Sequence, residues 1–146
     1  MPRWPVEIPR VTPHGLYGYE RRNKKEGSCA SRGYPCVHYG LDLAGPAGTP
    51  VFAPEDGSIH AVFTGSLPPY RGYGPEGLIF RGKKTGAYHL LAHLDRGSVP
   101  SAMVPGGFWD RMTTPLYKSD DQRRQIEEGQ LIGTMSDANH THWEVR

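Results

Sequence analysis

The fold is decided by the stretch that reads HYGLDLAGPAGTPVFAPEDG from His38 to Gly57. Its residues 50–54 form a short apolar segment bounded by prolines, which predicts a short β-strand. The Asp56-Gly57 pair that follows is a turn signal, and residues 57–64 then predict a longer strand. The stretch therefore predicts short strands joined by tight turns.

The rest of the chain continues this β pattern. Residues 77–81 and 87–94 predict two strands joined by the hairpin-sized connection 82–86, and residues 131–135 and 140–146 predict two more. The chain has 146 residues with 19 glycines and 14 prolines, a composition that disfavours a helical bundle. We therefore expect one mainly β domain built on an antiparallel sheet.

Two segments fall outside this pattern. Residues 1–28 carry prolines at positions 2, 5, 9 and 13, which prevents a helix and predicts an extended N-terminal arm. The arm either lies across the domain, residues 29–146, or docks on a partner. Residues 95–127 form a long insertion with Phe108 and Trp109 and with little periodicity. A short helix near 122–128, with Ile126 as its one apolar residue, is a weak alternative at its end.

Charge and hydropathy exclude several classes of protein. The formal net charge is only +2, so a dedicated nucleic-acid-binding protein is not indicated. Arg21, Arg22, Lys24 and Lys25 gather in a small basic patch, for which a solvated loop is the simpler interpretation. No apolar run approaches the roughly 18 residues of a membrane span. The N-terminus lacks the apolar core of a secretory signal peptide, so we expect no export signal.

The seven histidines are the most informative side chains. His38 and Asp42 are four residues apart, so in an extended chain both lie on one face, and His140 and His142 share a face in the same way. His93 ends a separate apolar strand. Two imidazoles and a carboxylate match the three protein ligands of a catalytic zinc ion, with two histidines left for proton transfer. We interpret the other histidines, 14, 60 and 89, as surface or core residues.

The two cysteines leave three alternatives open. Cys29, Cys36 and His38 could hold a structural metal, although their spacing is not that of the common zinc ribbons or fingers. A disulfide between Cys29 and Cys36 is favoured if the protein works outside a reducing compartment, where it would steady the loop before His38. Two free thiols are the third alternative.

Three ordered motifs give the chain a resemblance to a known family. Residues 38–57 are similar to H-x-G-x-D followed by G-T-P-V-x-A-P-x-x-G, and Leu91-Ala-His-Leu94 is similar to Y-x-H-L. Residues 128–133 and 140–146 are similar to G-Q-x-I-G followed by H-x-H-F-E-V. From Val37 to Arg146 the chain resembles the lysostaphin-like, or LytM-domain, zinc endopeptidases of bacterial peptidoglycan.

The resemblance implies a role for five residues. His38, Asp42 and His142 would bind Zn²⁺, and His93 and His140 would be the catalytic pair beside it. Zinc would polarise the scissile carbonyl and lower the pKa of a water molecule. One of the two catalytic histidines would take the proton, and the other would stabilise the tetrahedral oxyanion. Neither the bond that is cut nor the assignment of the two roles can be inferred from the sequence.

The chain also departs from the family pattern. The loop before the H-x-H motif, residues 134–139, is shorter than usual and the insertion 95–127 is longer, while the family places a strand near 122–128. These differences leave an alternative function, a metal-binding but inactive module that serves as a structural or activating component. Without an export signal, the enzyme would be a bacteriophage lysis enzyme or a tail component, carried to the wall by the particle. The arm and the insertion would then dock on tail or baseplate proteins.

Overall fold

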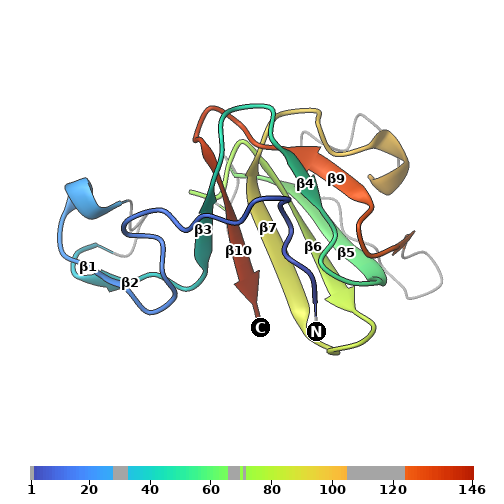
Figure 1. Cartoon of the computed structure of the whole chain (residues 1–146), viewed down its shortest axis with the longest axis horizontal. Helices are drawn as coiled ribbons and strands as arrows, with labels where there is room; N and C mark the ends of the chain where they lie inside the picture. Colours follow the sequence, from blue (N-terminus) through green and yellow to red (C-terminus); the bar gives the residue numbers. More distant parts are fainter. Residues whose placement is uncertain (1, 28–32, 66–69, 71, 105–123) are drawn as a thin grey trace.

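A computed structural model of the chain describes residues 2–27, 33–65, 70, 72–104 and 124–146. Its main element is a six-stranded antiparallel sheet with the strand order β3-β10-β7-β6-β5-β8 (Figure 1). The strands are β3 (Leu41–Ala44), β5 (Gly57–Thr64), β6 (Glu76–Gly82), β7 (Tyr88–Leu94), β8 (Gln125–Ile126) and β10 (His140–Val145). The predicted mainly β, antiparallel fold is confirmed, including the hairpin between β6 and β7.

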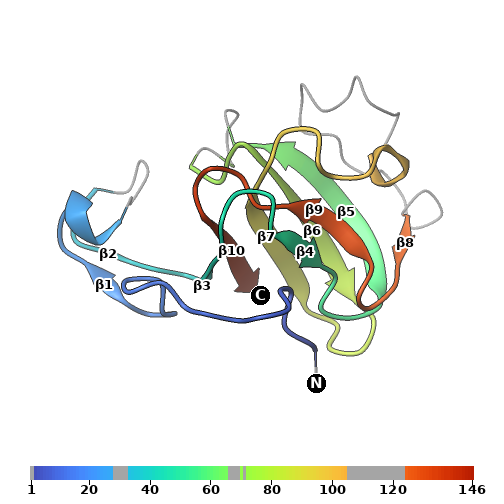
Figure 2. The same ribbon diagram turned by 45° about the horizontal axis from the view of Figure 1, so that its top comes forward.

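A second, two-stranded sheet covers one face of the first. It pairs β4 (Pro50–Phe52) with β9 (Leu131–Thr134), and both strands lie over β5, β6 and β7 in Figures 1 and 2. Val51 and Ile132 from this sheet belong to the same fully buried cluster as Ile59, Leu78 and Leu91 from the main sheet. The core between the two sheets thus anchors β7 and β10, which carry the candidate site on the other face.

The N-terminal segment lies along the domain, as the first of the two alternatives predicted. Val6 is buried in the core, the Phe52 amide donates to the Pro5 carbonyl over 2.7 Å, and the Ala44 amide donates to the Arg10 carbonyl over 2.6 Å. Beyond it, β1 (Glu20–Arg21) and β2 (Cys36–Val37) form a small ribbon with the 3₁₀-helix η1 (Lys24–Glu26). Figure 2 shows this ribbon projecting from the main body beside β3.

The helix considered near residues 122–128 is wrong for the residues described there. Residues 125–126 instead form β8, in which Ile126 lies opposite Gly57 of β5 and is only 2% exposed. A single apolar residue gives a helix no face to bury, whereas a short edge strand buries it and pairs its backbone. The insertion contains the 3₁₀-helix η3 (Ser101–Met103), and its residues 105–123, with Phe108 and Trp109, lie outside the described residues.

The cysteine alternatives are reduced by the state of Cys36, which is disulfide-bonded. Its sulfur is therefore not a thiolate ligand, and the structural site built from Cys29, Cys36 and His38 is excluded; Cys29 lies outside the described residues.

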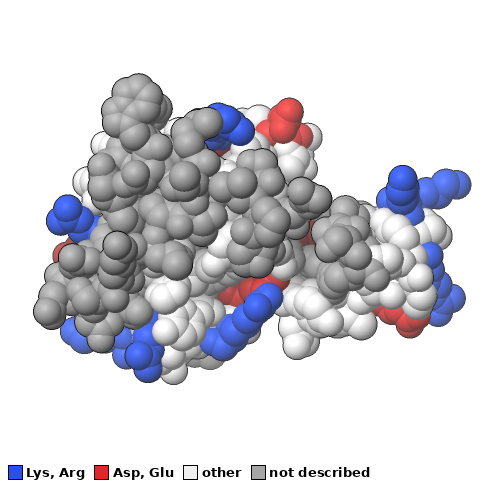
Figure 3. Space-filling view, turned by 180° about the vertical axis from the view of Figure 1, so that it is seen from behind, with Lys and Arg blue, Asp and Glu red and all other residues white. Residues whose placement is uncertain are grey.

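Over the ranges described, no helix is both long and apolar enough to cross a membrane. Figure 3 shows Lys and Arg side chains distributed over the described part of one face, without a single dominant basic patch.

Candidate metal centre

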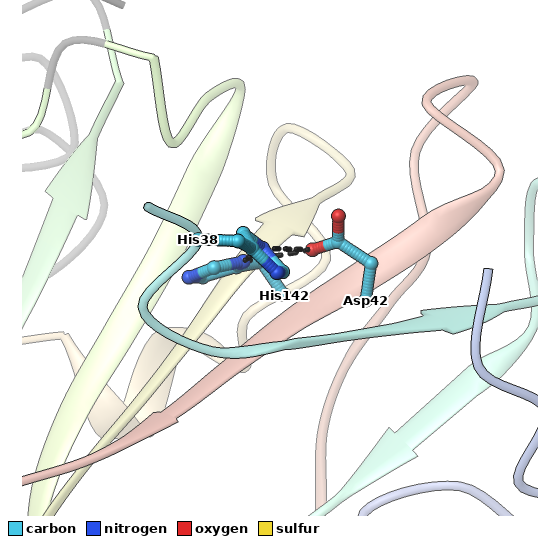
Figure 4. Close-up of side chains that lie close together, drawn as sticks. All are labelled: His38, Asp42 and His142. Carbon is cyan, nitrogen blue, oxygen red and sulfur yellow. Dashed lines mark hydrogen bonds and ion pairs between the residues drawn. The ribbon is translucent and has the colours of Figure 1, made fainter. Parts of the chain in front are cut away.

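The predicted ligands His38, Asp42 and His142 converge in space. Asp42 of β3 lies directly opposite His142 of β10 in the antiparallel register, and His38 reaches them from the segment between β2 and β3. His142 Nδ1 lies 2.7 Å from Asp42 Oδ1, and His38 Nε2 lies 3.1 Å from the same oxygen and 3.0 Å from His142 Nδ1. Figure 4 shows the three side chains pointing toward one another, and all three are buried.

The outer hydrogen bonds fix which ring nitrogen carries the proton. His38 Nδ1 lies 3.1 Å from the Leu16 carbonyl, which can only accept, so this nitrogen is the donor. His142 Nε2 lies 2.9 Å from Glu144 Oε1 and donates to that carboxylate. In the neutral rings, His38 Nε2 and His142 Nδ1 then carry lone pairs, and these face the equally proton-free Asp42 Oδ1. Three acceptors in contact require a cation or a shared proton between them.

The geometry and chemistry of this set suit a zinc ion. Ligands about 2.0–2.1 Å from a tetrahedral zinc are roughly 3.3 Å apart, so the observed contacts of 2.7–3.1 Å need only a small expansion. Burial raises the pKa of the Asp42 carboxyl, but in the metal-free cluster the hydrogen bonds that the His142 and His38 rings make to it through a shared proton outweigh this effect and hold that pKa well below its usual range. The carboxylate is therefore ionised at neutral pH, as a metal ligand must be.

Polar groups behind the candidate ligands hold His142 in place, and they were not predicted from the sequence. Glu144 accepts from His142 Nε2, from the Tyr73 hydroxyl over 2.9 Å, and from Arg146 Nε over 2.8 Å. Burial raises the pKa of the Glu144 carboxyl, but the hydrogen bond from His142 and the positive charges nearby lower it overall. Strand alternation could have found Glu144, because it shares a face of β10 with His142.

The two predicted catalytic histidines lie beside this cluster. The His93 and His140 rings have centroids 4.6 Å apart, and His140 Nε2 lies 3.9 Å from Asp42 Oδ1. His93 Nδ1 donates to the Gly74 carbonyl over 2.7 Å, and His140 Nδ1 donates to the Ala138 carbonyl over 2.9 Å. Each ring therefore keeps its Nε2 lone pair available to accept a proton.

The backbone and the protonation state of His93 are both unusual. Its φ of +58° is in the left-handed region, where a residue other than glycine is uncommon. This conformation is held by hydrogen bonds from the His93 amide to the Tyr73 carbonyl and from the Ser136 amide to the His93 carbonyl. Burial lowers the pKa of the imidazole to about 4, so His93 is neutral at pH 7 and able to act as a proton acceptor.

Arg21 also contacts the site, which the sequence did not predict. Its Nη2 donates to Asp42 Oδ2 over 2.9 Å, and both side chains are at most 10% exposed. Arg21 is therefore not part of the basic patch in which the sequence analysis placed it, while Arg22, Lys24 and Lys25 are exposed as expected of a solvated loop. The sequence gives no signal for this ion pair, because its partners are 21 residues apart and belong to different sheets.

A hollow of about 430 Å³ adjoins the site on the same face of the main sheet. Tyr73 links the two, because its ring centroid is 5.5 Å from that of His142 while its side chain also lines the hollow. The remaining lining residues are His60, Tyr70, Ile79, Tyr88, Leu90 and Arg146. Aromatic and aliphatic walls with a few polar groups are typical of ligand-binding pockets.

None of the histidines interpreted as surface or core residues belongs to the described group with metal-ligand geometry. His89 is fully buried, lies 2.7 Å from Glu55 Oε1, and accepts from the Trp143 indole at Nδ1, so it is a core residue with both ring nitrogens paired. Within the described residues, His38, Asp42 and His142 form the one group with metal-ligand geometry. That these three residues bind zinc, and that His93 and His140 are catalytic, stay predictions.

Comparisons with known proteins identify the fold. No family model matches the sequence, and no curated protein matches it. Among solved structures, a zinc-containing peptidase from Vibrio cholerae is 21% identical, with a TM-score of 0.62 over 99% of this chain and 36% of that one. Csd3 from Helicobacter pylori is 19% identical, with a TM-score of 0.59 over 99% of this chain and 31% of that one.

Lysostaphin itself is 18% identical, with a TM-score of 0.55 over 98% of this chain and 46% of the other. The chain thus spans about a third to a half of the length of these three proteins. At these identities the similarity concerns the fold alone. With nearly all of the chain aligned and a mainly β, antiparallel architecture, the protein has the lysostaphin-like, or LytM-type, peptidase fold that its sequence motifs resemble.

Proposed function

We propose that the protein is a zinc-dependent endopeptidase that hydrolyses peptide cross-links of bacterial peptidoglycan. The observation that carries this proposal is the convergence of three lone pairs from His38, Asp42 and His142, with two further imidazoles beside them. When both rings are neutral no donor lies between these acceptors, and a bound cation would complete the cluster. Support for the substrate class comes from the fold, which the chain shares with lysostaphin and with a zinc-containing peptidase.

Metal binding and proton transfer would be carried out by different residues of the site. His38, Asp42 and His142 would hold Zn²⁺, which as a bound Lewis acid polarises the scissile carbonyl and makes water more acidic. His93, neutral and with Nε2 free to accept, can take a proton from the attacking water and return it to the leaving amine. His140, across a ring contact of 4.6 Å, could stabilise the oxyanion by donating from Nε2 once that nitrogen is protonated. The peptide chain would extend into the hollow beside Tyr73.

The experiment is mass spectrometry of purified, cross-linked peptidoglycan after incubation with the zinc-loaded protein. We expect new cross-link-derived peptides, and their masses will identify the bond that is cut. His93→Ala and His140→Ala should each slow release about 10²- to 10⁴-fold while zinc binding is kept. Lys24→Ala, a change on the exposed helix η1, is the control for purification and handling.

Two outcomes would count against the proposal. Intact peptidoglycan in the presence of stoichiometric zinc would favour the alternative, a metal-binding module that serves a larger assembly. A wild-type protein that takes up no zinc would remove the metal centre itself. Delivery to the wall by a bacteriophage particle, through the N-terminal segment or the insertion, stays a prediction that co-purification with virions would test.

A further inference from the structure

The second oxygen of the Asp42 carboxylate has a dedicated partner. Oδ1 faces the two imidazoles, whereas Oδ2 accepts from Arg21 Nη2 over 2.9 Å in a pair that is at most 10% exposed. A buried, charge-assisted hydrogen bond of this kind fixes the rotation of the carboxylate about its side chain. Oδ2 is thereby turned away from the position where the lone pairs of His38 and His142 converge.

The guanidinium is itself held in place by its surroundings. Arg21 Nη2 also lies 3.3 Å from the His14 carbonyl, and the Arg21 backbone pairs with Cys36, which is disulfide-bonded. Gly27 packs directly against the side chain: a Cβ at that position would lie 2.7 Å from both Arg21 Cζ and Nε. These contacts allow the guanidinium little freedom, so its direction toward Asp42 is set by the small ribbon.

The N-terminal segment also holds the backbone of the candidate ligands. The Asp42 amide donates to the Gly15 carbonyl over 2.9 Å, and the His38 amide donates to the Tyr19 carbonyl over 2.9 Å. The Leu16 carbonyl, in turn, fixes the tautomer of His38. Residues 12–21 therefore contact two of the three candidate ligands through both backbone and side chain, although the sequence divides them from the domain.

We infer that Arg21 is a positioning residue of the metal centre, which keeps Asp42 a one-oxygen ligand by occupying its second oxygen. Two imidazoles and one carboxylate oxygen are three protein ligands, the number that a catalytic zinc site uses when it keeps a position open for water. Without Arg21, the carboxylate can rotate and offer both oxygens, which fills that position. The inference rests on the proposed metal site but adds a residue and a role that the motifs do not contain.

The test measures coordination rather than activity. Arg21→Met keeps the length of the side chain and removes its charge and donors, and Arg22→Met, at the exposed neighbouring position, is the matched control. Each protein is loaded with Co²⁺, whose visible absorption is stronger with four ligands than with five or six. We expect the Arg21→Met spectrum to weaken toward that of a higher coordination number and its Zn²⁺ affinity to fall 10- to 100-fold. Arg22→Met should match the wild type.

A second variant covers the case in which Arg21→Met does not fold. Gly27→Ala leaves the arginine in the chain but places a methyl group against its guanidinium, at a residue with φ of +121°, and should produce the same spectral change. An unchanged Co²⁺ spectrum in the folded variants overturns the inference, whatever their affinity, because Asp42 then keeps its binding mode without Arg21. A wild-type protein that binds neither metal overturns the metal site itself, a failure that is seen before any variant is compared.

Discussion

Among the residues that the structure describes, two buried carboxylate–imidazole clusters are built in opposite ways. In the first, which we call the structural cluster, Glu55 accepts from His89, from the Thr85 hydroxyl and from the Lys84 and Thr85 amides. His89 in turn accepts from the Trp143 indole over 3.2 Å. Every acceptor named here has a donor, so the structural cluster is complete as it stands.

In the second, the candidate metal centre, the donors point outward and the acceptors point inward. His38 and His142 donate to Leu16 and Glu144 respectively, which leaves their other nitrogens against Asp42 Oδ1. The same residue types therefore form a fully hydrogen-bonded network in the structural cluster, and a set of acceptors that face one another in the candidate metal centre. A ligand site therefore differs from a packed network in which ring nitrogen of each histidine carries the proton, more than in the presence of histidine and carboxylate.

The largest expected effect is that of Zn²⁺ on the free energy of unfolding, which should depend on the candidate metal centre and not on the structural cluster. With free Zn²⁺ at about 1,000 times its dissociation constant, removing the metal with a chelator should lower the free energy of unfolding by about 4 kcal/mol. Asp42→Ala should abolish this difference, because it removes the central acceptor. Glu55→Ala should keep it on a less stable background. Chemical denaturation of each protein with and without Zn²⁺ measures both quantities, and a chelator effect that persists in Asp42→Ala would place the metal elsewhere.

The next effect concerns the structural cluster by itself. Glu55→Ala should lower the free energy of unfolding by about 3 kcal/mol, because it leaves the donors of His89, Thr85 and Lys84 without their buried acceptor. Zn²⁺ stoichiometry should stay that of the wild type. Denaturation curves and metal analysis check the two statements, and a loss of zinc in a folded Glu55→Ala protein would show that the clusters are not independent.

The pH dependence of stability should also differ between the clusters when no metal is bound. Burial lowers the pKa of His142, but hydrogen bonds to Asp42 and Glu144 outweigh it and raise that pKa above its ordinary 6.5. The resulting stabilisation is fully present below pH 6.5 and is lost as the pH rises through the higher, folded-state pKa. The chelated wild type should therefore lose stability as the pH rises above about 6.5.

The structural cluster responds at the acid end, where the lowered pKa values of Asp42 and Glu144 also contribute. Burial raises the pKa of Glu55, but hydrogen bonds from Thr85 and His89 outweigh it and lower that pKa below its ordinary 4.5. Its stabilisation is present above pH 4.5 and is lost as the pH falls through the folded-state value. In chelator, His142→Gln should flatten the alkaline slope, and Glu55→Gln should make the acid slope shallower. Equal slopes in wild type and His142→Gln would contradict this assignment.

The parts of the molecule that the sequence predicts are those governed by local patterns. Strands such as 57–64 and 87–94 could be predicted because turn residues bound them and alternation marks their faces. The strand at Ile126 was harder to predict, because a single apolar residue is compatible with a helix or a strand until its partner strand β5 is known. Local patterns therefore determine the strands, while an isolated edge position depends on the tertiary fold.

The candidate site divides in the same way. His38 with Asp42, and His140 with His142, could be grouped by spacing, whereas Arg21 could not, since nothing local distinguishes it from its exposed neighbours. The structural cluster also shows why residue type alone misleads. His89 shares a strand with His93, and only its contacts with Glu55 and Trp143 show that both of its ring nitrogens are paired.

The smallest expected effect comes from removing one hydrogen bond of the structural cluster, the one between Trp143 and His89. Trp143→Phe removes the indole N–H that donates to His89 Nδ1 over 3.2 Å but keeps an aromatic ring beside the imidazole. We expect the free energy of unfolding to fall by about 1 kcal/mol, the net value of one hydrogen bond that leaves a buried acceptor unpaired. Zinc affinity should not change, although Trp143 directly follows His142 in β10, because alternate residues of a strand face opposite sides of the sheet. Calorimetric titration with Zn²⁺ checks this point, and a weaker affinity in the variant would mean that β10 couples the two clusters instead of separating them.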